Sequence, residues 1–552
     1  MNSFSTSSGL GDGSAAGSLR MNKTLVQPSM ERAPSGNVRE PIWRSKAVLV
    51  LGFVGLVVAG VVVSFVGRGL IDRYGSLAVF GLIFVGPPLF VLGVMGLRQC
   101  AEKYRVFRQQ MTWWHWLWLI MVASNFVFRT RDIGSVQENP LDAWAAYRIG
   151  LVGITAFVLL IRLVLKRPHW MGSLFHGLPG VVATFALICI LSTVWSFNPP
   201  WTLYKSIEYL IDISLLAAIL ATVSSLESYE SLMDWTWIIC GLLVTVAWIE
   251  APIWPEEALE GSGGYMGGPL QYRLSGVYPG QGYNMLGTYG AILATIAICR
   301  LLPTAAKKID RAWYLVLLGL GVITMVFAQT RSAIGGFLVG VILALIFTKR
   351  VKLIALFAAI GGVIFAFTGA GNLMTEFLER GQTTEQLASL SGRLEWWGVA
   401  WEAFKQHPLT GYGAFTSGMS VFPKLGVKEI TPLHSDYVET LVGIGMWGPL
   451  LIIIGLIGTW WILLRSTRRF AFASKEYQLA VEAIAVLGVL TVRTTVMGVI
   501  MSQPPIQYFA ILGYAEFLRR RYSKVAAPQV EASVNSSLPP MRAPRLSPPF
   551  LD

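Results

Sequence analysis

The chain has 552 residues, of which 54% are hydrophobic and only 14% are charged. A mean hydropathy of +0.57 and 20 tryptophans exclude a soluble multidomain protein and predict a polytopic membrane protein. The formal net charge of +13 does not indicate a partner nucleic acid, because the basic residues cluster in short loops beside apolar runs, as membrane topology requires.

Changes in composition along the chain also divide it into two tails and two membrane regions. Residues 1–45 are rich in Ser and Gly and lack the apolar region of a signal peptide, so we expect a disordered cytoplasmic tail, and we expect another at 521–552. Between them, N-terminal transmembrane helices should occupy 46–175, and a functional membrane domain should occupy 176–520, including a large outward loop at 370–433. The four cysteines lie in or beside apolar runs and predict no disulfide framework.

Apolar runs follow one another along the chain. By a criterion of about 17–25 residues per crossing, we count about 14 crossings and predict an all-α bundle of about 12–14 transmembrane helices. The runs are 46–66, 76–97, 112–128, 147–165, 177–196, 206–224, 232–254, 283–302, 312–329, 332–348, 352–369, 435–464, 479–500 and 505–518.

The positions of the basic segments support this number of membrane crossings. The basic segments "RQCAEKYRVFR", "LKRPH", "KKIDR", "KRVK", "RSTRRF" and "RRRYSK" fall in alternate loops or in the C-terminal tail, which predicts a cytoplasmic N-terminus. Two loops do not fit, because "SSLESYES" is acidic on the cytoplasmic side and "FRTRDIG" is basic on the outer side. The run between "KKIDR" and "KRVK" has basic flanks that should share a side, so it must cross twice and turn at "AQTRSA". Gly336 and Gly340 favour close packing of the second helix on a neighbour.

Distinctive polar residues then gather on the outer side. Arg273 lies in a glycine-rich loop before a helix, Arg331 in the "AQTRSA" turn, Arg393 on a loop helix and His434 at the start of an apolar helix. Arginine suits phosphate because its rigid fork grips two oxygens, and histidine takes a proton near neutral pH. The set predicts a site for a lipid-linked diphosphate leaving group and a hydroxyl nucleophile.

No metal site is expected beside His434, because the following Asp436 and Glu439 are spread around the helix rather than aimed at one ion. No cofactor is expected either.

Five motifs in order resemble the O-antigen ligase and polymerase superfamily of membrane glycosyltransferases over roughly residues 180–460, the last two being the most specific. They are "VWSFNPPWTLYKS", "RLSGVYPGQGYNMLGTY", "QTRSAIGGFLVG", "SGRLEWWGVAWEAFKQHPLTGYGAF" and "HSDYVETLVGIGMWG". The resemblance implies that 176–520 is an O-antigen ligase-like domain with a GT-C-like architecture, a helix bundle with a large periplasmic loop.

The resemblance also implies roles. Arg273 and Arg331 would bind the donor diphosphate, and His434 would activate the acceptor hydroxyl. Arg393 would bind substrate or shape the loop. The sequence departs from the family in two places: Asn284 comes later than the usual asparagine of its motif, and Asp436 stands where many members carry asparagine.

Asp436 and its neighbours Tyr437 and Glu439 therefore have an open role, in substrate contact or in support of the loop.

The leading hypothesis is a metal-independent, inverting glycosyltransferase in the bacterial cytoplasmic (inner) membrane. It would move a glycan from a polyprenyl (undecaprenyl) diphosphate donor to an acceptor hydroxyl on the periplasmic face. The acceptor stays open between the lipid A core, another lipid-linked repeat and a protein, and membrane lipids are the expected surroundings. A flippase or transporter of lipid-linked glycans is the alternative, although such proteins tend to place polar groups near the bilayer midplane.

Each site residue also has a structural reading. His434 can be a structural residue at the interface, Arg331 can anchor a turn, and Arg273 and Arg393 can be ordinary loop charges. Acidic and basic residues inside the apolar runs are expected to pair with one another or to line a cavity. These are Glu208, Asp212, Glu250, Glu482 and Arg493.

Overall fold

The computed structural model describes most of the chain from residue 91 onward. The described residues are 91, 93–96, 98–99, 101, 104–105, 107–126, 143–261, 270, 272–302, 311–367, 370–379, 382–383, 386, 388–425, 432–501 and 505–536. The predicted tail at 1–45, the crossing at 46–66 and most of the crossing at 76–97 lie outside them.

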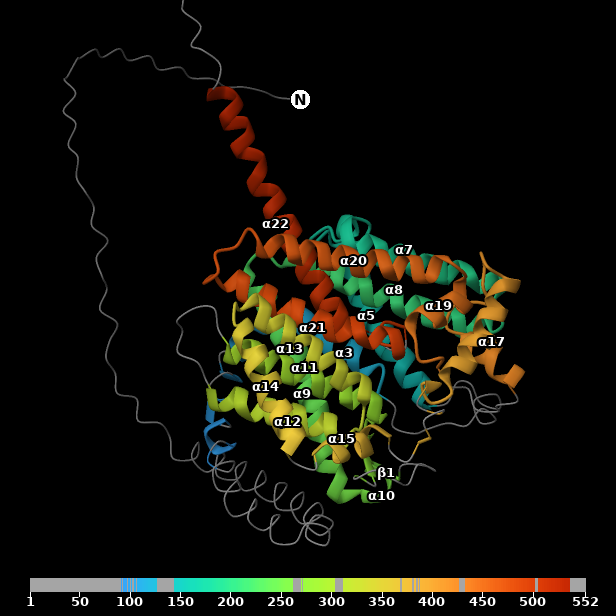
Figure 1. The fold of residues 1–552 in the computed structure, drawn as a ribbon. Coiled ribbons are helices and arrows are strands. Elements are labelled where there is room, and N and C mark those ends of the chain that lie inside the picture. The colour runs from blue at the N-terminus through green and yellow to red at the C-terminus, as the bar shows by residue number, and fades with distance from the viewer. Residues whose placement is uncertain are drawn as a thin grey trace, which may run out of the picture. The chain divides into compact units, whose positions relative to one another are not determined.

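Helices dominate the described residues (Figure 1). They are α3 (Trp113–Ala123), α5 (Ala143–Val164), α6 (Met171–Leu174), α7 (Gly177–Leu191), α8 (Pro199–Thr222), α9 (Leu226–Ile253), α10 (Pro255–Ala258), α11 (Tyr283–Leu301), α12 (Arg311–Phe327), α13 (Arg331–Phe347), α14 (Val351–Phe367), α15 (Ala370–Glu379), α17 (Arg393–Gln406), α18 (Ser417–Val421), α19 (Asp436–Ile444), α20 (Trp447–Thr467), α21 (Lys475–Val496) and α22 (Ile506–Ser536). Short 3₁₀ turns follow α7 (Ser192–Trp195) and α18 (Phe422–Leu425).

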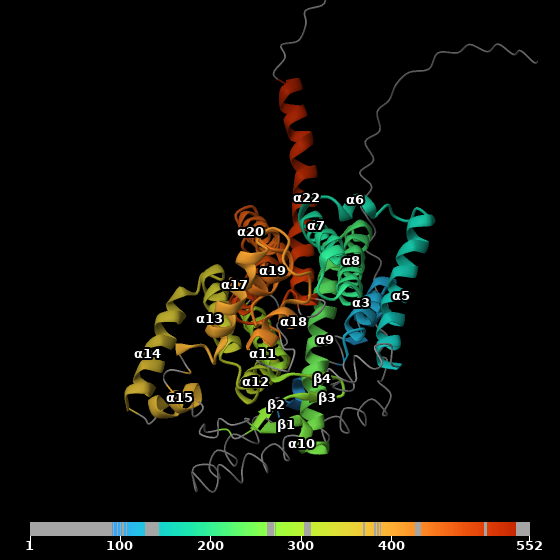
Figure 2. The ribbon, with the colours of Figure 1, turned by 90° about the vertical axis from the view of Figure 1, so that its right-hand side faces the viewer.

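Two small antiparallel hairpins stand between α10 and α11 (Figure 2). Strand β1 (Leu259–Gly261) pairs with β2 (Tyr272–Leu274), and β3 (Gly276–Val277) pairs with β4 (Gly280–Gln281). In the first hairpin Arg273 lies opposite Glu260. The hairpins give the outward loop before α11 a defined path.

Six of the described helices are long and apolar enough to cross a membrane, so the chain is a polytopic helical membrane protein. These segments are Ala143–Val164, Gly177–Trp195, Leu226–Ile253, Tyr283–Leu301, Trp447–Thr467 and Lys475–Val496. Four shorter apolar helices accompany them, namely Trp113–Ala123, Arg311–Phe327, Arg331–Phe347 and Val351–Val363. The total of about 12–14 crossings stays a prediction.

Capping side chains explain where several helices begin. Asn198 caps α8 by accepting the N–H of Trp201, and Pro199 follows at the first helical position, where its missing donor costs nothing. Ser225 caps α9 in the same way. Helix α8 therefore begins before the predicted crossing at 206–224, whose position in a membrane stays a prediction.

The prediction of one crossing at 435–464 is wrong. The helix ends at Ile444, Gly445 adopts a left-handed φ of +67°, and α20 starts at Trp447. A Cβ at Gly445 would stand 2.5 Å from the carbonyl oxygen of Pro408, so the close approach requires glycine. As a result, α19 is a separate short helix that follows His434. At the other end of the chain, α22 continues to Ser536, past the predicted start of the tail at 521.

Helix α13 packs closely on α21, as the two glycines predict. A Cβ at Gly336 would lie 3.1 Å from the carbonyl oxygen of Val489, and one at Gly340 would lie 3.0 Å from that of Ala485. Small residues let the two backbones approach, which is a common device in membrane bundles. The contact holds the first turn of α13 close to the end of α21.

The basic loops gather at one end of the bundle, which we call the basic end. The hydroxyl of Tyr477 donates to the carbonyl of Phe347 at 2.7 Å and joins the start of α21 to the end of α13. The Arg520 guanidinium donates to the Ser173 hydroxyl at 2.8 Å and joins α22 to α6. The predicted alternation of the loops is consistent with these contacts. The outward loops lie at the opposite end, which we call the site end.

Candidate active site

Three of the four predicted site residues stand at the start of a helix at the site end. Arg331 is the first residue of α13, Arg393 is the first residue of α17, and His434 lies two residues before α19. Arg273 lies on β2, in the segment that leads to α11. The first turn of a helix leaves N–H groups unpaired and carries partial positive charge, so these positions favour anions.

The loop that carries Arg273 is held by two buried side chains. The amide of Gln329, from the "AQTRSA" turn, donates to two backbone carbonyls at the start of β2, at 2.9 and 2.8 Å. The carboxylate of Glu250 accepts two backbone N–H groups at β3 and just after it, at 2.8 and 2.7 Å. The Arg273 guanidinium stacks 4.9 Å from the ring of Tyr283, and its Nε is buried without a hydrogen-bond partner.

Arg331 is held by neutral oxygens of the outward loop. Its Nη1 donates to the carbonyl of Leu378 at 2.8 Å, and its Nη2 donates to Oε1 of Gln382 at 2.5 Å and to the Ser391 hydroxyl at 3.5 Å. Arg273 is close enough for its positive charge to act on Arg331. The two arginines therefore lie in the same region of the site end.

Arg393 extends the positive cluster toward the histidine. Its Nη1 donates to the carbonyl of Val496, at the end of α21, at 2.8 Å. Burial lowers the pKa of Arg393, and the nearby charge of Arg331 lowers it further. The turn before it is strained, because Leu390 and Ser391 have left-handed φ values of +53° and +63°.

His434 lies beside this cluster and is mostly buried. Its ring stacks on Trp396, with centroids 6.1 Å apart, and its Nδ1 is buried without a hydrogen-bond partner. Burial, together with the positive charges of Arg393 and Arg493, lowers the pKa of His434 to about 4. The imidazole is therefore neutral at physiological pH and can accept a proton.

The backbone around His434 is fixed on both sides. The residue has a left-handed φ of +56°, a conformation that a non-glycine residue adopts only when its surroundings hold it there. The indole of Trp397 donates to the carbonyl of Leu433 at 2.8 Å. The Glu439 carboxylate accepts the N–H of Leu433 and the hydroxyl of Ser417. The imidazole is thus presented by a rigid turn.

Residues 315–453 match the family model described as O-antigen ligase. This segment is thus similar to the O-antigen ligase family. The family comprises enzymes of lipid-linked glycan transfer, namely O-antigen ligases and polymerases, and the predicted resemblance is confirmed. The match contains Arg331, Arg393 and His434, whereas Arg273 precedes it. No curated protein matches the chain.

Asp436, within the matched segment, holds the backbone that follows α21. Its carboxylate is completely buried and accepts the backbone N–H groups of Val499, Ile500 and Met501 at 2.9, 3.0 and 2.9 Å. Tyr437 lies with its hydroxyl 3.5 Å from that of Thr494. Of the two roles predicted for these residues, the geometry favours support of the structure: Glu439 holds the outward loop at Ser417 and the turn at Leu433, and Asp436 holds the segment between α21 and α22.

We expect Asp436→Asn to destabilise the protein by roughly 1–3 kcal/mol, because the amide offers one acceptor oxygen where two accept three N–H groups. The measurement is thermal unfolding in detergent. The matched control is Glu402→Gln on α17, whose side chain is 65% exposed and pairs only with Lys405, so its unfolding temperature should not move. Equal unfolding temperatures for the two variants would contradict the proposed support.

A further arginine near the site was not predicted to belong to it. Arg493 lies inside the predicted crossing 479–500, where we expected it to pair with an acidic residue or to line a cavity. Its guanidinium nitrogens donate to neutral oxygens of Thr288, Ser332 and Asn284. Glu482 pairs instead with Arg300, at 2.7 Å. A charge inside an apolar run is the signal that would have found Arg493, since such charges are functional candidates.

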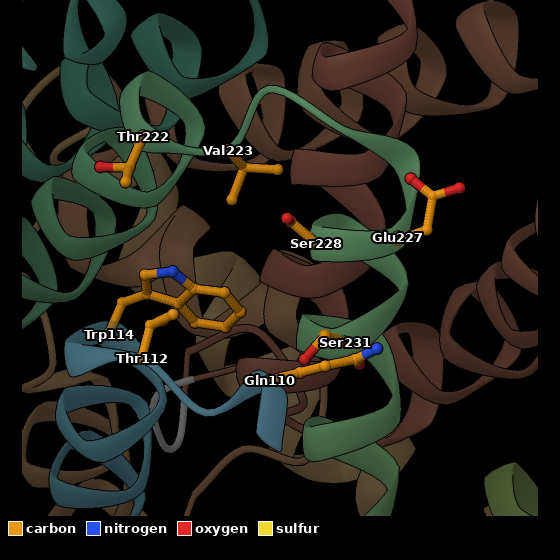
Figure 3. Close-up of a pocket in the computed structure, with 8 residues that line it drawn as sticks. All are labelled: Gln110, Thr112, Trp114, Thr222, Val223, Glu227, Ser228 and Ser231. Atoms are coloured by element: carbon orange, nitrogen blue, oxygen red, sulfur yellow. The ribbon is translucent and has the colours of Figure 1, made fainter. Parts of the chain in front are cut away.

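One cavity, whose lining residues are drawn in Figure 3, lies away from these residues. It measures about 260 Å³ and is lined by Gln110, Thr112, Trp114, Thr222, Val223, Glu227, Ser228 and Ser231. No arginine is among these residues, so the cavity does not suit a diphosphate. In the described part of the chain, no three His, Cys, Asp or Glu side chains gather closely enough to hold a metal ion, and metal independence stays a prediction.

Proposed function

We propose that the protein is a metal-independent, inverting glycosyltransferase. It transfers a glycan from a polyprenyl diphosphate donor to an acceptor hydroxyl on the periplasmic face of a bacterial inner membrane. The observation that carries this proposal is a mostly buried, neutral histidine beside three arginines, none of which forms an ion pair within the described part of the chain. No carboxylate lies within ion-pair distance of Arg273, Arg331 or Arg393 among the described residues.

The donor half of the site is the arginine cluster. Like charges repel, so Arg273 and Arg331 are brought together at a cost that an anion between them removes. Each guanidinium group can donate a pair of hydrogen bonds to two oxygens of a diphosphate. The first turns of α13 and α17 add partial positive charge. Groups placed in this way stabilise the charge that grows on the diphosphate as it leaves the sugar.

The acceptor half is His434. The acceptor oxygen attacks the anomeric carbon, its proton passes to the imidazole, and the bond from that carbon to the phosphate oxygen breaks with its electron pair leaving on the diphosphate. A single attack from the side opposite the leaving group inverts the anomeric configuration. The rigid turn around His434 keeps the imidazole in place for this transfer.

The proposed orientation of the protein in the membrane is argued from the positions of its basic loops. Basic loops are retained on the cytoplasmic side of a bacterial inner membrane, so the basic end faces the cytoplasm and the site end faces the periplasm. The donor's polyprenyl chain then stays in the bilayer, while its diphosphate reaches the arginines at the membrane surface. The loop at 370–433, which carries α15, α17 and α18, lies on the acceptor side.

The test uses purified protein in nanodiscs with a polyprenyl diphosphate glycan, in EDTA, with three acceptors offered separately. They are lipid A core, a second lipid-linked glycan and a hydroxyl-bearing protein, and mass spectrometry follows the products. We expect transfer to one acceptor class, with an inverted anomeric carbon by NMR. Retained configuration, or loss of transfer in EDTA, contradicts the mechanism. Movement of donor between leaflets without transfer favours the transporter alternative.

A further inference from the structure

Arg493 on α21 is a buried guanidinium close to the proposed donor site. Its side chain is 0% exposed. Nε donates to the Thr288 hydroxyl at 3.0 Å, Nη2 donates to the carbonyl of Asn284 at 2.9 Å, and Nη1 donates to the hydroxyl of Ser332. Thr288 and Asn284 belong to the first turns of α11, and Ser332 follows Arg331 in α13.

The bundle gives Arg493 no counterion within ion-pair distance among the described residues. Arg300, in contrast, has its charge balanced by two carboxylates, since it pairs with Asp234 at 2.6 Å and with Glu482 at 2.7 Å. Asp436 is the carboxylate whose charge reaches Arg493, but its oxygens are engaged by backbone N–H groups. A buried charge without a counterion is strongly disfavoured, because it has lost its hydration without gaining a partner. A neutral side chain can also donate hydrogen bonds to hydroxyl and carbonyl oxygens, so the three hydrogen bonds of Arg493 do not by themselves explain why a charged residue lies here.

The position of Arg493 links it to every part of the proposed site. The three donor nitrogens of Arg493 connect the start of α11 to the start of α13. Helix α11 follows the hairpins that carry Arg273, and α13 begins with Arg331. Three residues further along, the carbonyl of Val496 accepts from Arg393 at 2.8 Å. His434 lies close enough to Arg493 that the positive charge of this arginine lowers the pKa of the imidazole. The end of α21 therefore joins the helix starts that carry the site.

We propose that Arg493 is a positioning residue of the donor site. It fixes the first turns of α11 and α13 so that Arg273 and Arg331 face one anion, and its own charge is compensated when the donor diphosphate arrives. This inference rests on the proposed function. Because the side chain is fully buried, Arg493 acts through the arginines it positions and through its field, without touching the substrate.

The experiment measures thermal unfolding of the full-length protein against inorganic diphosphate, because a ligand that binds the folded state raises the unfolding temperature according to its Kd. The variants are Arg493→Gln, Arg493→Lys and the control Arg300→Lys. We expect at least tenfold weaker binding for Arg493→Gln and a smaller loss for Arg493→Lys, which keeps the charge but loses the fork. Arg300→Lys should bind like the wild type.

Glycan transfer gives the second measurement. A positioning role raises the donor KM in Arg493→Lys and leaves the acceptor KM unchanged, whereas a merely structural role lowers the active fraction and leaves both constants in place. If Arg493→Gln does not fold, Arg493→Lys carries the test. Wild-type affinity and donor KM in the lysine variant, or in both variants, overturn the inference. Failure of the wild type to bind diphosphate or to transfer glycan overturns the proposed function itself.

Discussion

Replacing His434 by alanine should lower glycan transfer by roughly 10²- to 10⁴-fold, the usual contribution of a general base. The acceptor hydroxyl is a poor nucleophile until its proton is removed, and His434 is the neutral base that the site presents. Donor affinity should change little, because the diphosphate is held by the arginines. The measurement is kcat with saturating donor and acceptor in nanodiscs, together with binding of inorganic diphosphate.

The matched control for this variant is His407→Ala. His407 is exposed at the end of α17 and makes an edge contact with Tyr412, with ring centroids 4.8 Å apart. Its replacement should leave kcat within about twofold, in line with the small effects of surface substitutions. His434→Gln should be as inactive as the alanine variant, since an amide does not accept a proton at neutral pH. Equal kcat for the wild type and His434→Ala would remove His434 as the base.

The same histidine predicts the pH profile. With a pKa of about 4, His434 is protonated and inactive only in acid, so kcat/KM should rise with pH up to about 5 and then stay level. Bound diphosphate offsets the positive charges of Arg393 and Arg493, which depress this pKa. The acid limb of kcat, which reports the bound complex, should therefore lie at a higher pH than that of kcat/KM. An acid limb at the same pH in both profiles would place the base elsewhere.

Much of this arrangement could be predicted from the sequence because its causes are local. Apolar length sets the long helices, and Gly336 and Gly340 set the contact between α13 and α21. The convergence of Arg273, Arg331, Arg393 and His434 follows from the alternation of crossings, which returns their loops to the same end.

The features that were missed depend on partners far away in the chain. The break at Gly445 is invisible in an apolar run, because it is imposed by the carbonyl of Pro408 in another loop. The engagement of Asp436 depends on N–H groups more than 60 residues later, after α21. The neutral partners of Arg493 lie on α11 and α13, and no local pattern points to them. Long-range hydrogen bonding is thus where the sequence is least informative.

Long-range hydrogen bonds also explain how the fold tolerates the positive charge of Arg331. Arg331 is surrounded by the carbonyl of Leu378 and by the side chains of Gln382 and Ser391, and Gln382 also donates to Ser391 at 3.0 Å. These neutral oxygens occupy the donors that phosphate oxygens would take. Binding of the donor should therefore exchange neutral acceptors for charged ones, which make stronger hydrogen bonds with arginine.

Replacing Arg331 by alanine should consequently lower kcat/KM for the donor by roughly 10²- to 10³-fold, the loss expected when one donor to a developing anion is removed. Arg331→Lys keeps the charge but loses the paired hydrogen bonds, so it should fall between the wild type and the alanine variant. The control is Lys405→Ala, whose side chain is 51% exposed on α17 and should be silent. Because Arg273 and Arg331 act on one anion, the double alanine variant should lose less than the product of the single losses. Fully multiplicative losses would mean that the two arginines bind separate groups, and the single diphosphate site would have to be abandoned.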